Sequence, residues 1–406
     1  MAYFYIGRAY TLLQDSIHAI ENYQYSLKYL PDYDLLYLFL GQENYILQKY
    51  SESKEYLVKC LNINDQIVEA RKLILKININ SKQYLEAEHD YMLLVQLNAI
   101  DKESEFEYIT ALFYQRKYID IVNIRKTNST IFSGEEIPQE VSFFIGRAYV
   151  FIKSWNEAHK YFRFLPQDPE YQYFYGYVLA NLGLFKEAET VISQLSTENT
   201  DLQNRINFLL GNIYLKLEEY ENAKTSYLST YNLYPENTEI NEALGCLFLN
   251  MGNLENARLH FNIAFSKNDS SCITSLGLAL IYEKQYQYQE AIKYYEISLN
   301  LKEENWIYLK IGILSALLED FIKAQRFLEK YTSVYCDEDL CLYYLGYTYA
   351  KLQQYELAII QWLKLCNKHS EDEQLNLNIL QVRYKYGVEL VDLMEYDKAI
   401  IEWEIY

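Results

Sequence analysis

The chain has 406 residues, of which 50% are hydrophobic and 23% charged, so it can build a sizeable core and is not expected to be disordered. It has 13 glycines and 5 prolines, too few turn residues for an all-β fold of this length. The formal net charge is −19, and the sequence contains no cluster of Lys or Arg. Nucleic acid is therefore not expected as a partner, because binding it requires clustered positive charge.

Targeting and membrane signals are missing from the sequence. No apolar run approaches the roughly 18 residues that a membrane span requires, so membrane insertion is not expected. The N-terminal stretch lacks a basic region and a small-residue cleavage site. Six scattered cysteines form no CxxC motif, which fits a reducing compartment. We expect a cytoplasmic protein, with a periplasmic or cell-envelope location as the alternative if a leader peptide was removed.

Glycines recur at a fixed interval along the chain. Gly7 and Gly41 lie 34 residues apart, and the same interval separates Gly211 from Gly245. A period of 34 in 406 residues corresponds to about twelve units.

Each unit contains two apolar faces with helical spacing. In the best-formed unit the first face has i, i+3, i+4, i+7 spacing, and the second begins six residues later and ends before a proline. The two faces consist of Asn207, Leu210, Gly211 and Tyr214, then Tyr220, Ala223, Tyr227 and Thr230, followed by Pro235. Each unit is therefore predicted to form two helices. Gly211 and Ala223 are expected where these helices cross, so that a side chain larger than a methyl group would push them apart.

This pattern resembles the tetratricopeptide repeat (TPR). The first unit matches the family signature at Tyr3, Ile6, Gly7, Tyr10, Ala19, Tyr23, Ser26 and Pro31. The resemblance recurs in register through the chain. It implies an all-α fold, a right-handed α-solenoid or superhelix of antiparallel helix pairs, whose first helices line a concave groove.

The repeats suggest a division of the chain. Residues 1–126 hold repeats 1 to 4, of which the third and fourth are degenerate because Leu75 and Ile109 replace the glycine. Residues 127–140 are predicted to be an irregular connection and a hinge. Residues 141–406 hold repeats 5 to 12, the last of them truncated.

The sequence shows no pattern of catalytic or metal-binding chemistry. Five separate histidines give no HExxH motif, and phosphate-binding loops and GxSxG motifs are absent. We therefore predict no catalytic residues, metal ligands or cofactors, and a protein that is not an enzyme.

The predicted binding residues stand at positions 5 and 9 of the first helices, counting the recurrent glycine as position 8. Aromatic side chains there are good interface anchors, and arginine can bind a carboxylate. The candidates are Phe143, Arg147, Tyr173, Tyr177, Phe208, Phe4, Arg8, Tyr343 and Tyr347.

The leading interpretation is a non-enzymatic scaffold that binds a peptide or helical segment of a protein partner in this aromatic groove. One alternative is an assembly factor of a cell-envelope machine, such as a pilus, flagellar or secretion apparatus. Another is the TPR arm of a larger multidomain protein or enzyme. Because the last repeat lacks a polar capping helix, self-association through uncapped ends is also expected.

Overall fold

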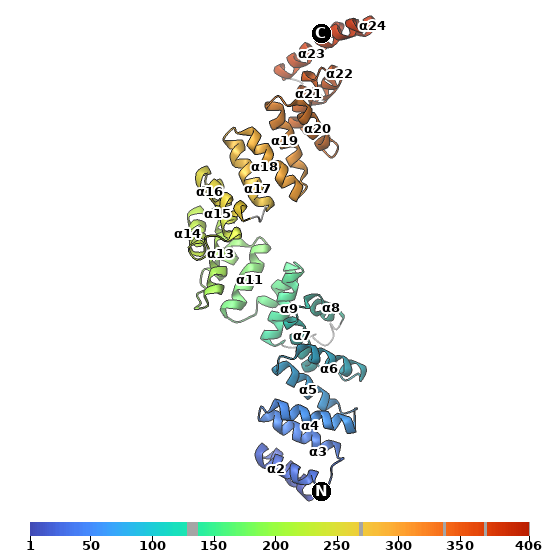
Figure 1. Cartoon of the computed structure of the whole chain (residues 1–406), viewed down its shortest axis with the longest axis vertical. Helices are drawn as coiled ribbons and strands as arrows, with labels where there is room; N and C mark the ends of the chain where they lie inside the picture. Colours follow the sequence, from blue (N-terminus) through green and yellow to red (C-terminus); the bar gives the residue numbers. More distant parts are fainter. Residues whose placement is uncertain (128–136, 268–270, 336–337, 369–371, 406) are drawn as a thin grey trace. The chain divides into compact units, whose positions relative to one another are not determined.

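The computed structural model describes residues 1–127, 137–267, 271–335, 338–368 and 372–405. Within these ranges the chain forms 24 α-helices and no strand. Consecutive helices pair, as α3 does with α4 and α17 with α18 (Figure 1). The prediction of an all-α repeat fold with about twelve helix pairs is therefore confirmed.

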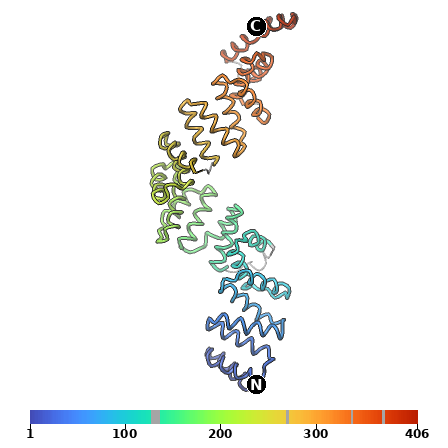
Figure 2. The backbone as a smooth tube through the Cα atoms, in the orientation of Figure 1, coloured from blue at the N-terminus to red at the C-terminus, as the bar shows by residue number. Residues whose placement is uncertain are grey.

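The chain forms two compact units, Met1–Ile206 and Asn207–Tyr406, and Figure 2 follows the backbone through each of them. The helices of the first unit are α1 Ala2–Leu12, α2 Ser16–Leu27, α3 Asp34–Ile46, α4 Tyr50–Ile63, α5 Val68–Asn80, α6 Tyr84–Gln96, α7 Lys102–Tyr114, α8 Tyr118–Thr127, α9 Gln139–Phe151, α10 Trp155–Phe162, α11 Pro169–Asn181 and α12 Phe185–Ile192.

Helix α13, Thr200–Lys216, begins in the first unit and continues into the second. The helices that follow are α14 Tyr220–Tyr231, α15 Thr238–Asn250, α16 Leu254–Ser266, α17 Cys272–Lys284, α18 Tyr288–Leu301, α19 Asn305–Leu317, α20 Phe321–Thr332, α21 Asp339–Lys351, α22 Tyr355–Cys366, α23 Glu373–Asp392 and α24 Tyr396–Ile405. Residues 128–136, the centre of the predicted connection, lie outside the described residues. The hinge and the domain limits 1–126 and 141–406 stay predictions.

The turn inside each pair has a left-handed residue. In the first pair Gln14 has φ +60°, and the Asp15 N–H donates to the Tyr10 carbonyl at 3.0 Å, which is the 6→1 bond of a Schellman motif. The equivalent bond closes all twelve described pairs. Glycine occupies the left-handed position only in the turns at Gly183 and Gly252. The other turns place there Gln14, Gln48, Lys82, Arg116, Lys153, Glu218, Tyr286, Glu319, Gln353 and Met394.

The recurrent glycine makes room for a large side chain sixteen residues later. A Cβ atom built at Gly245 would lie 2.8 Å from the ring of Phe261, closer than real Cβ atoms approach other groups. Even a methyl group is therefore too large without a shift of the neighbour, which is a tighter limit than the sequence suggested. The pairs are Gly7–Tyr23, Gly41–Leu57, Gly146–Phe162, Gly176–Ile192, Gly211–Tyr227, Gly245–Phe261, Gly312–Leu328, Gly346–Trp362 and Gly387–Trp403.

Three repeats lack this glycine and pack differently. In the third repeat Leu75 is fully buried, and Tyr91 stacks on Tyr108 of the next repeat with ring centroids 3.9 Å apart. In the fourth repeat Ile109 is fully buried, and the residue sixteen positions later is an arginine rather than a ring. The ninth repeat has Ala279 at the glycine position. The degenerate repeats are thus packed, and one buried cluster extends from residue 75 to residue 178.

Replacing Gly245 with Leu should destabilise α15 and α16 by about 1–3 kcal/mol, because the new side chain overlaps the Phe261 ring. Amide hydrogen exchange of the two helices in the full chain measures this, since a repeat array need not unfold in one step.

The control is the double variant Gly245→Leu with Phe261→Ala. It should lose less stability than the sum of the two single variants, because removal of the ring relieves the overlap. Strict additivity would contradict the steric explanation.

Candidate partner-binding face

The first unit brings four of the predicted binding residues together on two neighbouring first helices. Phe143 and Arg147 lie on α9, and Tyr173 and Tyr177 lie on α11. The rings of Tyr173 and Tyr177 are 6.5 Å apart and stacked, and both side chains are half-buried. Phe143 is buried, with 5% of its surface exposed, so in the free chain its ring contributes to packing.

The guanidinium of Arg147 lies on aromatic rings. Its Cζ atom is 4.0 Å from the centroid of Phe174 and 5.6 Å from that of Phe143. The nearest carboxylate contact is long, 3.7 Å from Nη1 to Oε1 of Glu170. Burial lowers the pKa of Arg147, and the neighbouring Arg205 adds repulsion in the same direction. Its hydrogen-bonding capacity is therefore incompletely used.

Arg205 is a candidate that the sequence analysis missed. It lies at the start of α13, within the first unit, and its Cζ atom is 4.5 Å from the ring centroid of Tyr173 and 5.4 Å from that of Phe174. The guanidinium groups of Arg147 and Arg205 thus both lie against the ring of Phe174. Among the described residues Arg205 makes no ion pair within 4.0 Å. Arg205 could have been identified from the sequence because it stands three residues before Phe208, on the same helical face.

The remaining candidates lie elsewhere in the two units. In the first unit, Phe4 is buried and the exposed Arg8 lies 5.0 Å over the ring of Phe39. In the second unit, Tyr343 is exposed and Tyr347 lies beside Phe321 at 6.0 Å. Phe208 is half-buried and also belongs to the second unit. The role of all nine residues in binding a partner stays a prediction.

A pocket lies between the first helices α5, α7 and α9, and we call it the Glu107 pocket. Its volume is about 530 Å³. It is lined by Ile79, Asn80, Lys82, Tyr84, Glu103, Phe106, Glu107, Thr110, Tyr114, Pro138, Glu140 and Val141. Tyr84 and Tyr114 stack with their centroids 4.8 Å apart and form an aromatic wall. Burial raises the pKa of Glu107 to about 6; Lys76 opposes this shift, whereas Glu103 and Glu140 add to it.

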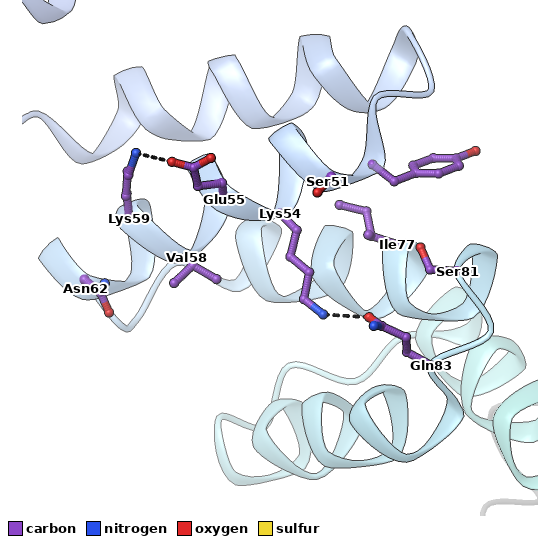
Figure 3. Close-up of a pocket in the computed structure, with 10 residues that line it drawn as sticks. Ser51, Lys54, Glu55, Val58, Lys59, Asn62, Ile77, Ser81 and Gln83 are labelled. Atoms are coloured by element: carbon purple, nitrogen blue, oxygen red, sulfur yellow. Dashed lines mark hydrogen bonds and ion pairs between the residues drawn. The ribbon is translucent and has the colours of Figure 1, made fainter.

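In another pocket the charged groups are already paired. Figure 3 shows this groove between α4 and α5, of about 650 Å³. Lys54 Nζ donates to Asn78 Oδ1 at 2.6 Å and to Gln83 Oε1 at 2.9 Å, and Lys59 Nζ lies 2.6 Å from Glu55 Oε1. It offers a ligand fewer uncompensated charges than the face of α7, α9 and α11.

Three of the described cysteine thiols are poor nucleophiles. Burial raises the pKa of Cys60 and of Cys246 to about 11, and that of Cys341 to about 12, so these groups are protonated at neutral pH. In the described part of the chain no group of His, Cys, Asp and Glu is arranged to hold a metal ion. None of the helices described is both long and apolar enough to cross a membrane.

The fold and this face define a helical-repeat protein of the interaction-scaffold class. Models described as tetratricopeptide repeat match residues 36–67 and 205–237, residues 242–304, and residues 340–372. The chain is a tetratricopeptide repeat protein. Members of this family bind protein partners and are typically non-enzymatic.

Similar proteins include the anaphase-promoting complex subunit 3 of Schizosaccharomyces pombe. It is 27% identical over 153 residues, which are 37% of this chain and 23% of that protein. The aligned part therefore spans less than a quarter of the relative's length.

Two solved structures are also similar. YrrB, described as a TPR protein with an unusual peptide-binding site, is 18% identical with a TM-score of 0.41, over 48% of this chain and 96% of that one. The Cut9–Hcn1 hetero-tetramer of the anaphase-promoting complex is 11% identical with a TM-score of 0.37, over 94% and 75% of the two chains.

Replacing Glu107 with Gln should stabilise the first unit at neutral pH. A carboxyl whose pKa is higher in the folded chain than in the unfolded chain destabilises the folded chain when it is ionised. For Glu107 this destabilisation is absent below the ordinary pKa of 4.5, and it grows as the pH rises through about 6. We expect a gain of about 1 kcal/mol at pH 7, after allowance for solvent screening, and none at about pH 4.

Amide hydrogen exchange of α7 in the full chain, compared between variant and wild type at each of the two pH values, measures the difference. Glu187→Gln, at an exposed position in the first turn of α12, is the control and should not raise stability at either pH, because it removes only the ordinary attraction of a carboxylate to a helix N-terminus. Equal stability of wild type and Glu107→Gln at pH 7 would refute the assignment.

Proposed function

We propose that this protein is a non-enzymatic scaffold that binds a segment of a protein partner along the first helices, with its main contact on α9, α11 and the start of α13. Tyr173 and Tyr177 serve as aromatic anchors, and Arg147 with Arg205 binds an acidic side chain or a C-terminal carboxylate. The observation that supports this best is the convergence of two guanidinium groups on the ring of Phe174 in a chain of net charge −19.

The guanidinium groups of Arg147 and Arg205 lack sufficient anionic neighbours. Glu170 is 3.7 Å from Arg147, longer than the 2.7–2.9 Å typical of a strong charged hydrogen bond. The planar guanidinium groups are held on rings, so little side-chain entropy is lost when a carboxylate binds. A carboxylate would also relieve the repulsion between Arg147 and Arg205. In other repeats the proposed contacts with the partner are made by Phe208, Phe4, Arg8, Tyr343 and Tyr347.

The place of this scaffold in the cell is proposed from its relative. The sequence similarity to a subunit of the anaphase-promoting complex favours a role in a multi-protein assembly. A cytoplasmic location fits this role.

Tyr177→Ala and Arg147→Glu should each weaken partner binding by about tenfold or more, because a well-packed aromatic anchor is worth about 2 kcal/mol and reversal of a charge repels the carboxylate. The partner is first identified by affinity purification and mass spectrometry. The dissociation constant is then measured with the purified partner, and the Arg147→Glu effect should be larger at low salt.

The control is Glu187→Ala, which changes an exposed side chain on the second helix of the same repeat as Tyr177. It should leave the affinity unchanged. If this control abolishes binding while both other variants bind normally, the partner site is not on the first helices.

A further inference from the structure

The Glu107 pocket presents negative charge that the described residues do not neutralise. Of its three glutamates, Glu103 pairs with Lys76 at 2.6 Å, whereas Glu107 and Glu140 make no ion pair with any described residue. Lys82 also lines the pocket, from the turn after α5. The groove of Figure 3 differs, since its lysines are already bound to neighbouring oxygens.

The walls of the pocket favour an organic cation. Tyr84 and Tyr114 form a stacked pair, and Phe106 adds a third ring. A lysine or arginine side chain can place its aliphatic stem on such rings and its charge near carboxylates, which combines apolar burial, cation–π attraction and ion pairing. These residues give no arrangement suited to a metal ion in the described part of the chain.

We propose that the Glu107 pocket binds a basic side chain, lysine or arginine, of the same partner segment whose acidic group binds at Arg147 and Arg205. The inference rests on the proposed function, and it adds the charge pattern of the partner. Glu140 and Arg147 both lie on α9, seven residues apart.

The spacing follows from helix geometry. Seven residues of α-helix rise about 10 Å, and an extended chain covers that distance in about three residues. The partner segment therefore carries a basic and an acidic residue about three positions apart. The order of charges along the helix also fixes the direction in which the segment lies.

Selection from a phage-displayed library of random linear peptides tests this proposal on the full chain. Wild type should select peptides with aromatic or apolar residues, an acidic residue, and a lysine or arginine about three positions from it. The double variant Glu107→Gln with Glu140→Gln should lose the basic residue from the selected set and keep the acidic one. Arg147→Gln should do the reverse. Glu55→Gln, in the groove of Figure 3, is the control and should select the wild-type set.

The outcomes separate the two proposals. Peptides selected without a basic residue, or with a basic residue that the double variant still selects, overturn the inference and leave the proposed function standing. Failure of wild type to select any peptide overturns both. Enrichment of basic residues that is lost only in the double variant supports the inference.

A selected basic peptide, synthesised with a fluorescent label, gives a second measurement. Its affinity for wild type should fall about tenfold between about pH 7.5 and about pH 5, as Glu107 takes up a proton and attracts the cation less. Glu107→Gln should bind more weakly at the higher pH and show a smaller pH dependence. Lys76, Lys82, Glu103 and Glu140 also face the pocket, so wild type and Glu107→Gln are compared at each pH to isolate the part due to Glu107. An equal pH dependence in the variant would overturn the assignment to Glu107.

Discussion

The contact between a glycine and a large side chain sixteen residues later is the constraint on which the repeats depend. In the nine repeats that have this glycine, even a Cβ atom at its position would collide with the side chain sixteen residues later. Phe261 shows how strict the fit is, because Gly245 and Gly277 border its ring from two different helices. One aromatic residue therefore links a helix pair to the next pair. The stability of the array is a sum of such local contacts, and each repeat needs its neighbours.

The sequence predicted the parts of the fold that follow from this contact. The 34-residue glycine interval indicated the helix pairs, and the glycine marked the crossing. The left-handed turns were not predictable from composition, because only Gly183 and Gly252 carry the usual residue. The other turns place side chains such as Gln48 and Tyr286 in a conformation that costs about 1 kcal/mol or more. Packing of the helix pair imposes this conformation and outweighs local preference.

The candidate site was predicted only in part, for a similar reason. Arg147, Tyr173 and Tyr177 could be predicted because positions 5 and 9 are defined by the pattern within a single repeat. Arg205 was missed because its contact with Tyr173 joins two repeats, and the spacing within one repeat does not reveal it. Phe143 was expected to be accessible, but the rings of Tyr171 and Phe174 lie against it at 4.6 and 5.6 Å. Contacts between repeats thus decide which side chains of the periodic face remain open.

The Glu107 pocket lies where the chain departs from the repeat pattern. Glu107 lies two residues before Ile109, in a repeat whose glycine is missing. The pocket lies among the first helices α5, α7 and α9. The carboxylates of the Glu107 pocket raise the free energy of the folded chain when no ligand is bound, because burial and mutual repulsion oppose their ionisation. A fold under selection for stability alone would gain from a neutral residue at position 107. A cation bound in the pocket would neutralise this charge, so binding would recover the free energy that folding lost.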